Sequence, residues 1–226
     1  MHGLRPSPAP LPAPVPDVVG VLETHLTVVC PDTQADRLAS WAAARELGFV
    51  HIVLARGRTR SQCMVNLVGA GSADAHGRAA ERVTDDLTAD GFSVARLKTE
   101  AAPWAEGVPP DDVTAAAQDP ARYFEHHVKL LLPAGQDRAL LEELVLPHTA
   151  HVSWNARRVR GDGQVERFVT QRCHGVGRTT AAARLSALLR TLHATTFPVL
   201  EVEREFVVRD THLGLDDGWI GQESPS

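Results

Sequence analysis

The chain of 226 residues contains an internal repeat, and this feature constrains its fold more than any other. Residues 24–100 and 126–205 carry the same succession of short apolar runs and helical stretches. The last runs, FSVARLKTE and FPVLEVERE, align without a gap. The matched positions include His25 with His127, Pro31 with Pro133, His51 with His151, and Glu100 with Glu205. Because all the runs agree in order, we interpret the two stretches as copies of one unit.

Each copy predicts the order strand–helix–strand–strand–helix–strand. The strands are predicted from alternating Val, Ile, Leu and Phe, and the helices from apolar residues three and four positions apart. This is the order of the ferredoxin-like unit, in which two helices cover one face of a four-stranded antiparallel sheet. We therefore expect an α+β protein of two tandem ferredoxin-like (βαββαβ) copies with antiparallel sheets, forming a pseudo-two-fold pair.

The segments around the copies differ from them in composition. Six prolines alternate with other residues between positions 6 and 16, which favours an extended, disordered tail. Pro, Asp and Ala dominate the stretch between the copies, as is typical of a linker. The expected divisions are a Pro-rich disordered tail (1–20), copy one (21–100), a linker (101–122), copy two (123–209) and a C-terminal tail (210–226).

The sequence also predicts the cellular location of the protein. It has no run of about 18 apolar residues, and its N-terminus lacks the apolar core of a secretory signal. Its three cysteines, Cys30, Cys63 and Cys173, lie in apolar runs without the spacing of a disulfide framework or a metal site. We expect reduced thiols in a cytoplasmic protein that has no membrane partner. The oligomeric state is left open.

Charge is distributed unevenly along the chain. The net charge of −5 argues against binding to duplex nucleic acid, which requires a broad basic field. Copy two is nevertheless basic, with eleven basic against eight acidic residues between positions 126 and 205. Only Lys98 and Lys129 are lysines, and every other basic residue is an arginine. In a chain that uses arginine so heavily, composition does not explain a lysine.

Strand alternation predicts which side chains face away from the helices. In copy two we assign Val128, Leu130, Val152, Leu200 and Val202 to the helix-covered core, together with Gln171. The opposite, open face is then polar. Its residues are His127, Lys129, His151, Asn155, Arg157, Thr170, Arg172 and Glu203. The same reasoning gives copy one an open face with His25, Thr27, Val29, His51, Val53, Met64 and Asn66.

The fourth strands of the two copies carry opposite charges at matched positions. Arg96 matches Glu201, and Lys98 matches Glu203. Such a reversal suits ion pairs between two copies related by a pseudo-two-fold axis. It is equally compatible with two solvated strands, and both interpretations stay open at this point.

The open face of copy two predicts a site for a small anionic ligand that bears a phosphate or a carboxylate. Lys129, Arg157 and Arg172 would bind the anion in a polar cavity between the copies, with Asn155, Thr170 and Glu203 as further ligand contacts. His127 and His151 would act as acid–base groups. The alternative is a non-catalytic module that binds a ligand or a protein, so whether the chain is an enzyme stays open. No cofactor is expected.

Other candidate chemistries have weaker signals. The glycines of Gly175-Val176-Gly177 precede a helix, where an anion could bind, but they also suit an ordinary turn. The neighbours Cys173 and His174 point to opposite faces of a strand, so we interpret Cys173 as a structural thiol. The pairs His126/His127 and His148/His151 have no carboxylate or cysteine cluster at ligand spacing, and we expect no metal site.

Two tetrapeptides resemble the motif of the two-histidine phosphoesterases. His151-Val152-Ser153-Trp154 and His25-Leu26-Thr27-Val28 both fit the pattern His-x-Thr/Ser-x of that family. The resemblance implies two related lobes that each offer a histidine and a hydroxyl to a central cleft. His151 matches His51 in the repeat, however, and His51-Ile52-Val53-Leu54 lacks the hydroxyl. A phosphoesterase-like enzyme is therefore a further alternative.

Overall fold

The computed structural model describes residues 17–133, 135, 138–157, 163–195 and 197–220. The strands are β1 (Val19–Val29), β2 (Gly48–Leu54), β3 (Ser61–Ser72), β4 (Ser93–Ala101), β5 (Tyr123–Pro133), β6 (Ala150–Asn155), β7 (Gln164–His174) and β8 (Val199–Asp210). The helices are α1 (Ala35–Ala43), α2 (Ala73–Ala89), α3 (Asp112–Ala116), α4 (Arg138–Val145) and α5 (Arg178–His193). Short 3-10 turns are η1 (Asp32–Gln34), η2 (Leu146–His148) and η3 (Leu213–Asp216).

The eight strands form one closed antiparallel barrel in the order β1-β3-β2-β6-β7-β5-β8-β4. Within each half of the chain, the first strand lies between the fourth and the third, and the second pairs with the third. The halves then join along two seams. Ile52–Leu54 pair with Ser153–Asn155, and Lys98–Ala101 pair with Phe206–Asp210.

The expected mixed α+β fold with an antiparallel sheet is confirmed. The strand–helix–strand–strand–helix–strand order occurs in residues 19–101 and again in residues 123–210, where it is made by β1 to β4 and β5 to β8. That the two halves are copies of one ancestral ferredoxin-like unit stays a prediction. Their sheets do not stack as two separate layers, because the two seams make them one barrel with a common interior.

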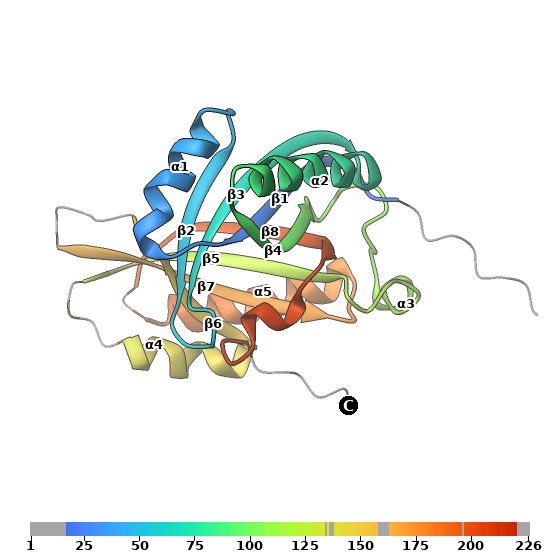
Figure 1. The fold of residues 1–226 in the computed structure, drawn as a ribbon. Helices are drawn as coiled ribbons and strands as arrows, with labels where there is room; N and C mark the ends of the chain where they lie inside the picture. The colour runs from blue at the N-terminus through green and yellow to red at the C-terminus, as the bar shows by residue number, and fades with distance from the viewer. Residues whose placement is uncertain (1–16, 134, 136–137, 158–162, 196, 221–226) are drawn as a thin grey trace, which may run out of the picture.

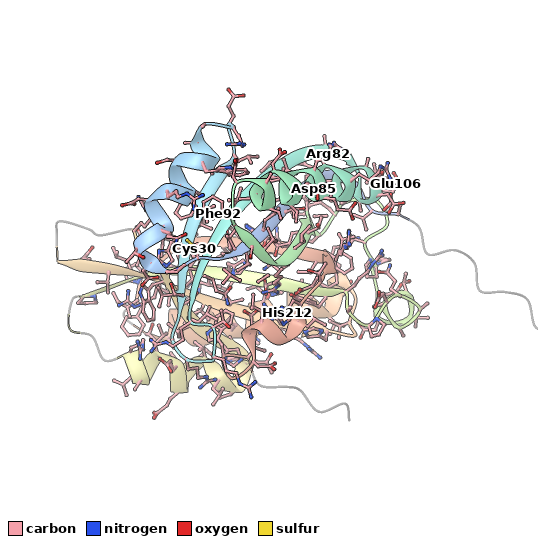
Figure 2. The ribbon with its side chains drawn as sticks, viewed as in Figure 1. Cys30, Arg82, Asp85, Phe92, Glu106 and His212 are labelled. Atoms are coloured by element: carbon pink, nitrogen blue, oxygen red, sulfur yellow. The ribbon has the colours of Figure 1, made fainter. Side chains whose placement is uncertain are left out.

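Apolar side chains fill the layer between the outer face of the barrel and the helices. Helices α1 and α2 lie on one side of the barrel, and α4 and α5 lie on the opposite side (Figure 1). Leu38 and Trp41 of α1 pack with Phe92, which is labelled in Figure 2. Leu141 of α4 and Leu188 of α5 are fully buried in the other half. The helices therefore cover the apolar outer face of the barrel, and polar residues line its inner face.

The predicted faces of copy two are correct on three strands. Val128, Leu130 and Val152 lie in the apolar layer under α4 and α5, as expected. Gln171 also lies on this side and is buried, but its side chain is satisfied. It donates to the backbone oxygen of His148 at 2.9 Å and pairs with His126 Nδ1 at 3.1 Å. A buried amide is tolerated here because it has partners.

The prediction was wrong for the start of β8. Leu200 and Val202 were expected in the core, yet 46% and 37% of their surfaces are exposed. Val202 has the predicted face, since it pairs with Val128 of β5, but a β-bulge leaves Leu200 without a partner on β5 and places Val199 opposite Leu130. Val199 therefore packs on the apolar layer in place of Leu200, and Val202 is only partly covered because α5 lies mainly against β5 and β7.

The prediction was also wrong for His51 and Val53, which were expected on the open face. His51 bonds to Ser61 at 2.7 Å on the helix-covered side, where its neighbour Phe49 joins the apolar layer. The pairing register explains the error. Thr170 pairs with His151, whereas Asn66, the counterpart of Thr170, pairs with Gly48. Gly48 is therefore the positional counterpart of His151, and the match of His51 with His151 was out of register.

The linker and the C-terminal segment both dock on the barrel. Gly177 N–H donates to the Asp112 carboxylate, and the next two amides donate to the carbonyl oxygens of Pro109 and Pro110. A Cβ on Gly177 would lie 2.2 Å from the Asp111 backbone, so this close approach requires glycine. The linker thus occupies the N-terminus of α5, and an anion does not have free access to those amides.

Candidate functional site

The barrel interior collects charged side chains from both halves. At one end lie Glu100, Glu125, His127 and Glu205, which we call the histidine–glutamate cluster. At the other end lie Arg96, Arg172, Asp210 and Asp216, which we call the arginine–aspartate cluster. Buried ionisable groups are costly, so such a concentration marks a candidate functional site.

His127 stands at the centre of the histidine–glutamate cluster. Its Nδ1 lies 2.9 Å from Thr170 Oγ1 on the neighbouring strand β7. Its Nε2 lies 3.3 Å from Glu125 and 3.4 Å from Glu205. About a fifth of the His127 side chain is exposed, and the same holds for Glu205. The ring is therefore fixed by a hydroxyl on one side and faces two carboxylates on the other.

The first half of the chain offers the same arrangement. His25 Nδ1 lies 3.0 Å from Asn66 Oδ1, and His25 Nε2 lies 2.9 Å from Glu100. Glu23 is farther away, with its carboxylate 3.9 Å from His25. His25 matches His127 and Glu100 matches Glu205 in the repeat. Each half thus contributes one histidine–glutamate pair to the same end of the barrel.

Lys98 lies between the two pairs. Its Nζ is 2.7 Å from Glu100 Oε1 and also contacts Glu125. The Lys98 side chain is 11% exposed, whereas the carboxylates of Glu100 and Glu125 are almost completely buried. Its ammonium group is therefore an internal counter-ion for two carboxylates from different halves.

Three carboxylate oxygens of the cluster make no hydrogen bond among the described residues. They are Glu100 Oε1, Glu100 Oε2 and Glu205 Oε2. Each of them is nevertheless in an ion pair. Glu100 Oε1 lies 2.7 Å from Lys98 Nζ, Glu100 Oε2 lies 2.9 Å from His25 Nε2, and Glu205 Oε2 lies 3.4 Å from His127 Nε2. One ligand atom from each of Glu100, Glu125, His127 and Glu205 lies within 4.8 Å of all the others. Carboxylate oxygens that converge this closely and are held mainly by ion pairs suit a cation.

The arginine–aspartate cluster is satisfied by contrast. Asp216 accepts from Arg96 at 2.8 Å, from Arg172 at 2.7 Å and from Gln62 at 2.9 Å. Arg96 also pairs with Asp210, and Arg172 donates to Glu125 at 2.5 Å. Asp216 belongs to η3, so the C-terminal segment completes this end of the barrel. Trp219, which follows, is buried and donates to the Val152 oxygen at 2.9 Å.

Neighbouring charges shift the pKa values of the histidine–glutamate cluster in different directions. Burial alone would lower the pKa of His127, but contact with Glu125 and Glu205 raises it to about 10. Burial opposes the charge on Glu100, yet Lys98 and His25 lower its pKa to about 2. Burial and the nearby Glu100 raise the pKa of Glu205. Glu205 is therefore the carboxylate whose charge is least compensated.

His151 has the opposite environment to His127, although both flank Thr170. Its Nδ1 accepts from Arg56 at 2.9 Å, and its ring lies 6.0 Å from that of Trp219. Burial, with the charges of Arg56 and Arg172, lowers the pKa of His151 to about 4. At neutral pH His151 is uncharged and His127 is an imidazolium.

The other predicted site residues are dispersed. Arg157 lies outside the barrel, exposed and 2.6 Å from Asp36 at α1. Asn155 accepts from the Arg157 backbone in the turn after β6. Lys129 faces inward and lies 3.4 Å from Glu166 and 3.9 Å from Glu201. Glu203 is exposed and lies opposite His127 in the pair of strands β5 and β8. The structure therefore brings together His127, Thr170 and Arg172 but not Arg157 or Asn155.

Ion pairs between the two halves, one of the two interpretations left open from the sequence, are present with other partners. Lys98 pairs with Glu125, and Arg96 pairs with Asp210 and Asp216, whereas Glu201 and Glu203 were the acids considered from the sequence. Glu125 was missed because it precedes the repeated stretch 126–205. In β5, Glu125 has the same parity as His127 and Lys129, so extending the alternation would have placed it inside the barrel.

Open space lies outside the barrel as well. A polar groove of about 480 Å³ runs over α2, β4 and β8 and is lined by residues such as Arg78, Arg122 and Arg209. The space next to His151 and Trp219 has no room for a water molecule. The cavity expected between two lobes is thus replaced by a barrel interior in which charged groups contact one another.

Comparison with known proteins adds little. The chain matches no protein-family model and no curated protein. A solved structure of a chlorite dismutase mutant from Candidatus Nitrospira defluvii is similar at 12% identity, covering 88% of this chain and 93% of that one, with a TM-score of 0.27. A likeness this low supports no conclusion about function. Among the described residues, no helix has the length and apolar character needed to cross a membrane.

Proposed function

We propose that the protein binds a divalent metal ion at the histidine–glutamate cluster. The observation that carries this proposal is the convergence of four ligand atoms, one from each residue, within 4.8 Å, where two of the residues, Glu100 and Glu205, have buried oxygens without a hydrogen bond among the described residues. Glu100, Glu125 and Glu205 would supply oxygen, and His127 would supply Nε2 once its proton has left. Thr170 would hold His127 in orientation through Nδ1, as groups behind a metal-bound histidine do.

The ligand set favours a particular class of metal. Three carboxylates and one imidazole are oxygen and nitrogen donors, which suit Mn²⁺, Fe²⁺ or Zn²⁺ rather than a soft ion such as Cu⁺. The surroundings also favour a cation over an anion. Seven glutamates lie at this end of the barrel, against five basic groups. The acids are Glu23, Glu100, Glu125, Glu166, Glu201, Glu203 and Glu205, and the basic groups are His25, Lys98, His127, Lys129 and Arg172, which pairs with Glu125.

The second candidate is a small ligand that bears a phosphate or a carboxylate. The observation that favours it is the environment of Lys129. The contacts of Lys129 with Glu166 and Glu201, at 3.4 and 3.9 Å, are longer than the 2.5 Å contact of Arg172 with Glu125. An anion could therefore compete for Lys129 more readily than for Arg172, with His127 as an acid–base neighbour. The charge balance at this end gives this candidate less support than a cation has, and turnover of the ligand stays open.

Calorimetric titration of the metal-free protein with Mn²⁺ tests the main proposal. We expect one ion per chain, and at least tenfold weaker binding in Glu205→Gln, since a charged contact contributes about 1.5–3 kcal/mol. Glu201→Gln is the matched control, because Glu201 lies on the same strand but contacts only Lys129 among the basic groups described above. Equal affinity in all three proteins, or binding only at the exposed acids, would overturn the proposal. Titration with inorganic phosphate, comparing wild type with Lys129→Met, tests the second candidate.

A further inference from the structure

Lys98 is the residue that distinguishes the two histidine–glutamate pairs. Its counterpart in the second half is Glu203, so the pseudo-symmetric arrangement places a base in one half and an acid in the other. Lys98 is also one of only two lysines in the chain. Its Nζ contacts Glu100 and Glu125, which are two of the four residues in the proposed metal site. Lys98 therefore competes directly for the carboxylates that a metal ion would use.

We propose that the Lys98 ammonium is the resident cation of the cluster and that a divalent ion binds by displacing it. This inference rests on the proposed function. Glu100, Glu125 and Glu205 carry three negative charges. Lys98, His25 and His127 can supply three positive charges, and Arg172 pairs with Glu125 as well while sharing its own charge with Asp216. The cluster is balanced without a metal. A divalent ion that entered beside the ammonium would be repelled by it at contact distance.

The side chain of Lys98 suits such an exchange better than an arginine would. Lysine carries a compact charge on a flexible four-carbon stem, whereas a guanidinium group is fixed by several hydrogen bonds in one plane. Arg172 illustrates the second case, since it donates to Glu125 at 2.5 Å and to Asp216 at 2.7 Å. Lys98 can release Glu100 and Glu125 while Arg172 keeps Glu125 in place. The exchange breaks only ion pairs and forms no covalent bond.

The consequence is that Lys98 sets the metal affinity of the site. A protein with this internal cation binds divalent ions only when they are abundant enough to replace it. Removing the ammonium leaves Glu100 and Glu125 without the cation that they share, although Arg172 still pairs with Glu125, and a metal ion could take the place of the ammonium. Substitution of Lys98 should therefore strengthen metal binding, although it removes a polar group from the site.

Mn²⁺ titration of wild type, Lys98→Met and Arg138→Met tests the inference. We expect Lys98→Met to bind Mn²⁺ at least tenfold more tightly than wild type, and Arg138→Met, which removes a base from an ion pair on the outer helix α4, to stay within about threefold of it. Weaker or unchanged binding in Lys98→Met, with clear binding in wild type, would overturn the role of Lys98 and leave the metal site standing. Absence of binding in all three proteins would instead overturn the proposed function.

A second measurement covers the case in which Lys98→Met folds poorly without metal. Urea unfolding of wild type, Lys98→Met and Lys98→Gln is measured at free Mn²⁺ concentrations that span a 1,000-fold range and are set by a chelator. We expect Mn²⁺ to raise the unfolding midpoint of both variants more than that of wild type, since a tighter ligand stabilises the folded state more. A larger Mn²⁺ effect on wild type would contradict the inference.

Discussion

The two ends of the barrel interior carry ionic clusters that differ in how completely their bonds are made. In the arginine–aspartate cluster, Asp216 accepts from three donors and Arg96 pairs with two aspartates. In the histidine–glutamate cluster, buried oxygens of Glu100 and Glu205 are in ion pairs but make no hydrogen bond among the described residues, and burial raises the pKa of Glu205. Both clusters are costly to bury, and the first compensates this cost more completely within the chain. The difference separates a cluster that holds the barrel together from one that is prepared for a ligand.

The largest effect is expected from breaking the satisfied cluster. Asp216→Ala removes the acceptor shared by Arg96, Arg172 and Gln62, and leaves two buried guanidinium groups with reduced compensation. Loss of one partner in a buried ion pair costs about 3–5 kcal/mol. We expect the free energy of unfolding, measured in urea, to fall by about that amount. Asp217→Ala, at the next and less buried residue, should change it by less than about 1 kcal/mol. Similar losses in both variants would show that the C-terminal segment does not close this end.

The next effect concerns pH and separates the two histidines that flank Thr170. The pKa of His151 is about 4 in the folded protein, because of burial and the charges of Arg56 and Arg172, and about 6.5 when unfolded. Above pH 6.5 both states are neutral, so the full contribution to stability is present. As the pH falls from 6.5 towards 4, the unfolded state binds a proton that the folded state does not. Stability should therefore decrease by on the order of 3 kcal/mol over this range.

Urea unfolding between pH 7.5 and 4 checks this expectation in wild type and His151→Gln. The glutamine oxygen can still accept from Arg56 but does not titrate, so its curve should be flatter in this range. His193→Gln, at an exposed position of α5, should follow wild type. If all three curves have the same slope, His151 is not held neutral by its surroundings.

The sequence could predict the outer layer of this fold because that layer follows side-chain periodicity. Val128, Leu130 and Val152 alternate with polar residues and lie under the helices as expected. Periodicity carries no information on the seams, because the pairs β2–β6 and β4–β8 depend on backbone hydrogen bonds between strand edges. It also failed at Val202, where the face was correct but the extent of helix coverage was not. Coverage is a tertiary property that one strand does not encode.

The candidate site was predictable in part. Alternation placed His127, Thr170 and Arg172 on the inner face, and all three contact the interior network. The repeat matched His25 with His127 and Glu100 with Glu205, but these matches indicate a shared site only once the barrel closes. Arg157 was wrongly assigned to the inner face because β6 ends at Asn155 and the chain turns away before it. Alternation extended beyond the end of a strand has no physical basis.

The smallest effect is expected for Glu205→Gln, which should not lower the free energy of unfolding. This variant tests the difference between the two clusters most directly. Burial and Glu100 raise the pKa of Glu205, so the folded state disfavours its charge. Glutamine has the same shape and removes that charge. We expect the free energy of unfolding at pH 7.5 in a chelator to stay at the wild-type value or to rise by up to about 1 kcal/mol. Metal affinity should fall in the same variant, as is common where a binding group is kept at some cost to stability.

Glu125→Gln is the matched variant, since Glu125 lies directly across the strand pair from Glu205 but is paired with Arg172 and Lys98. Removing its charge leaves two buried cations with less compensation, so we expect a loss of about 3 kcal/mol or more. The two substitutions change the same functional group on neighbouring strands and should have effects of different size or opposite sign. If Glu205→Gln destabilised the protein as much as Glu125→Gln, Glu205 would belong to the structural network, and the distinction between the two clusters would be wrong.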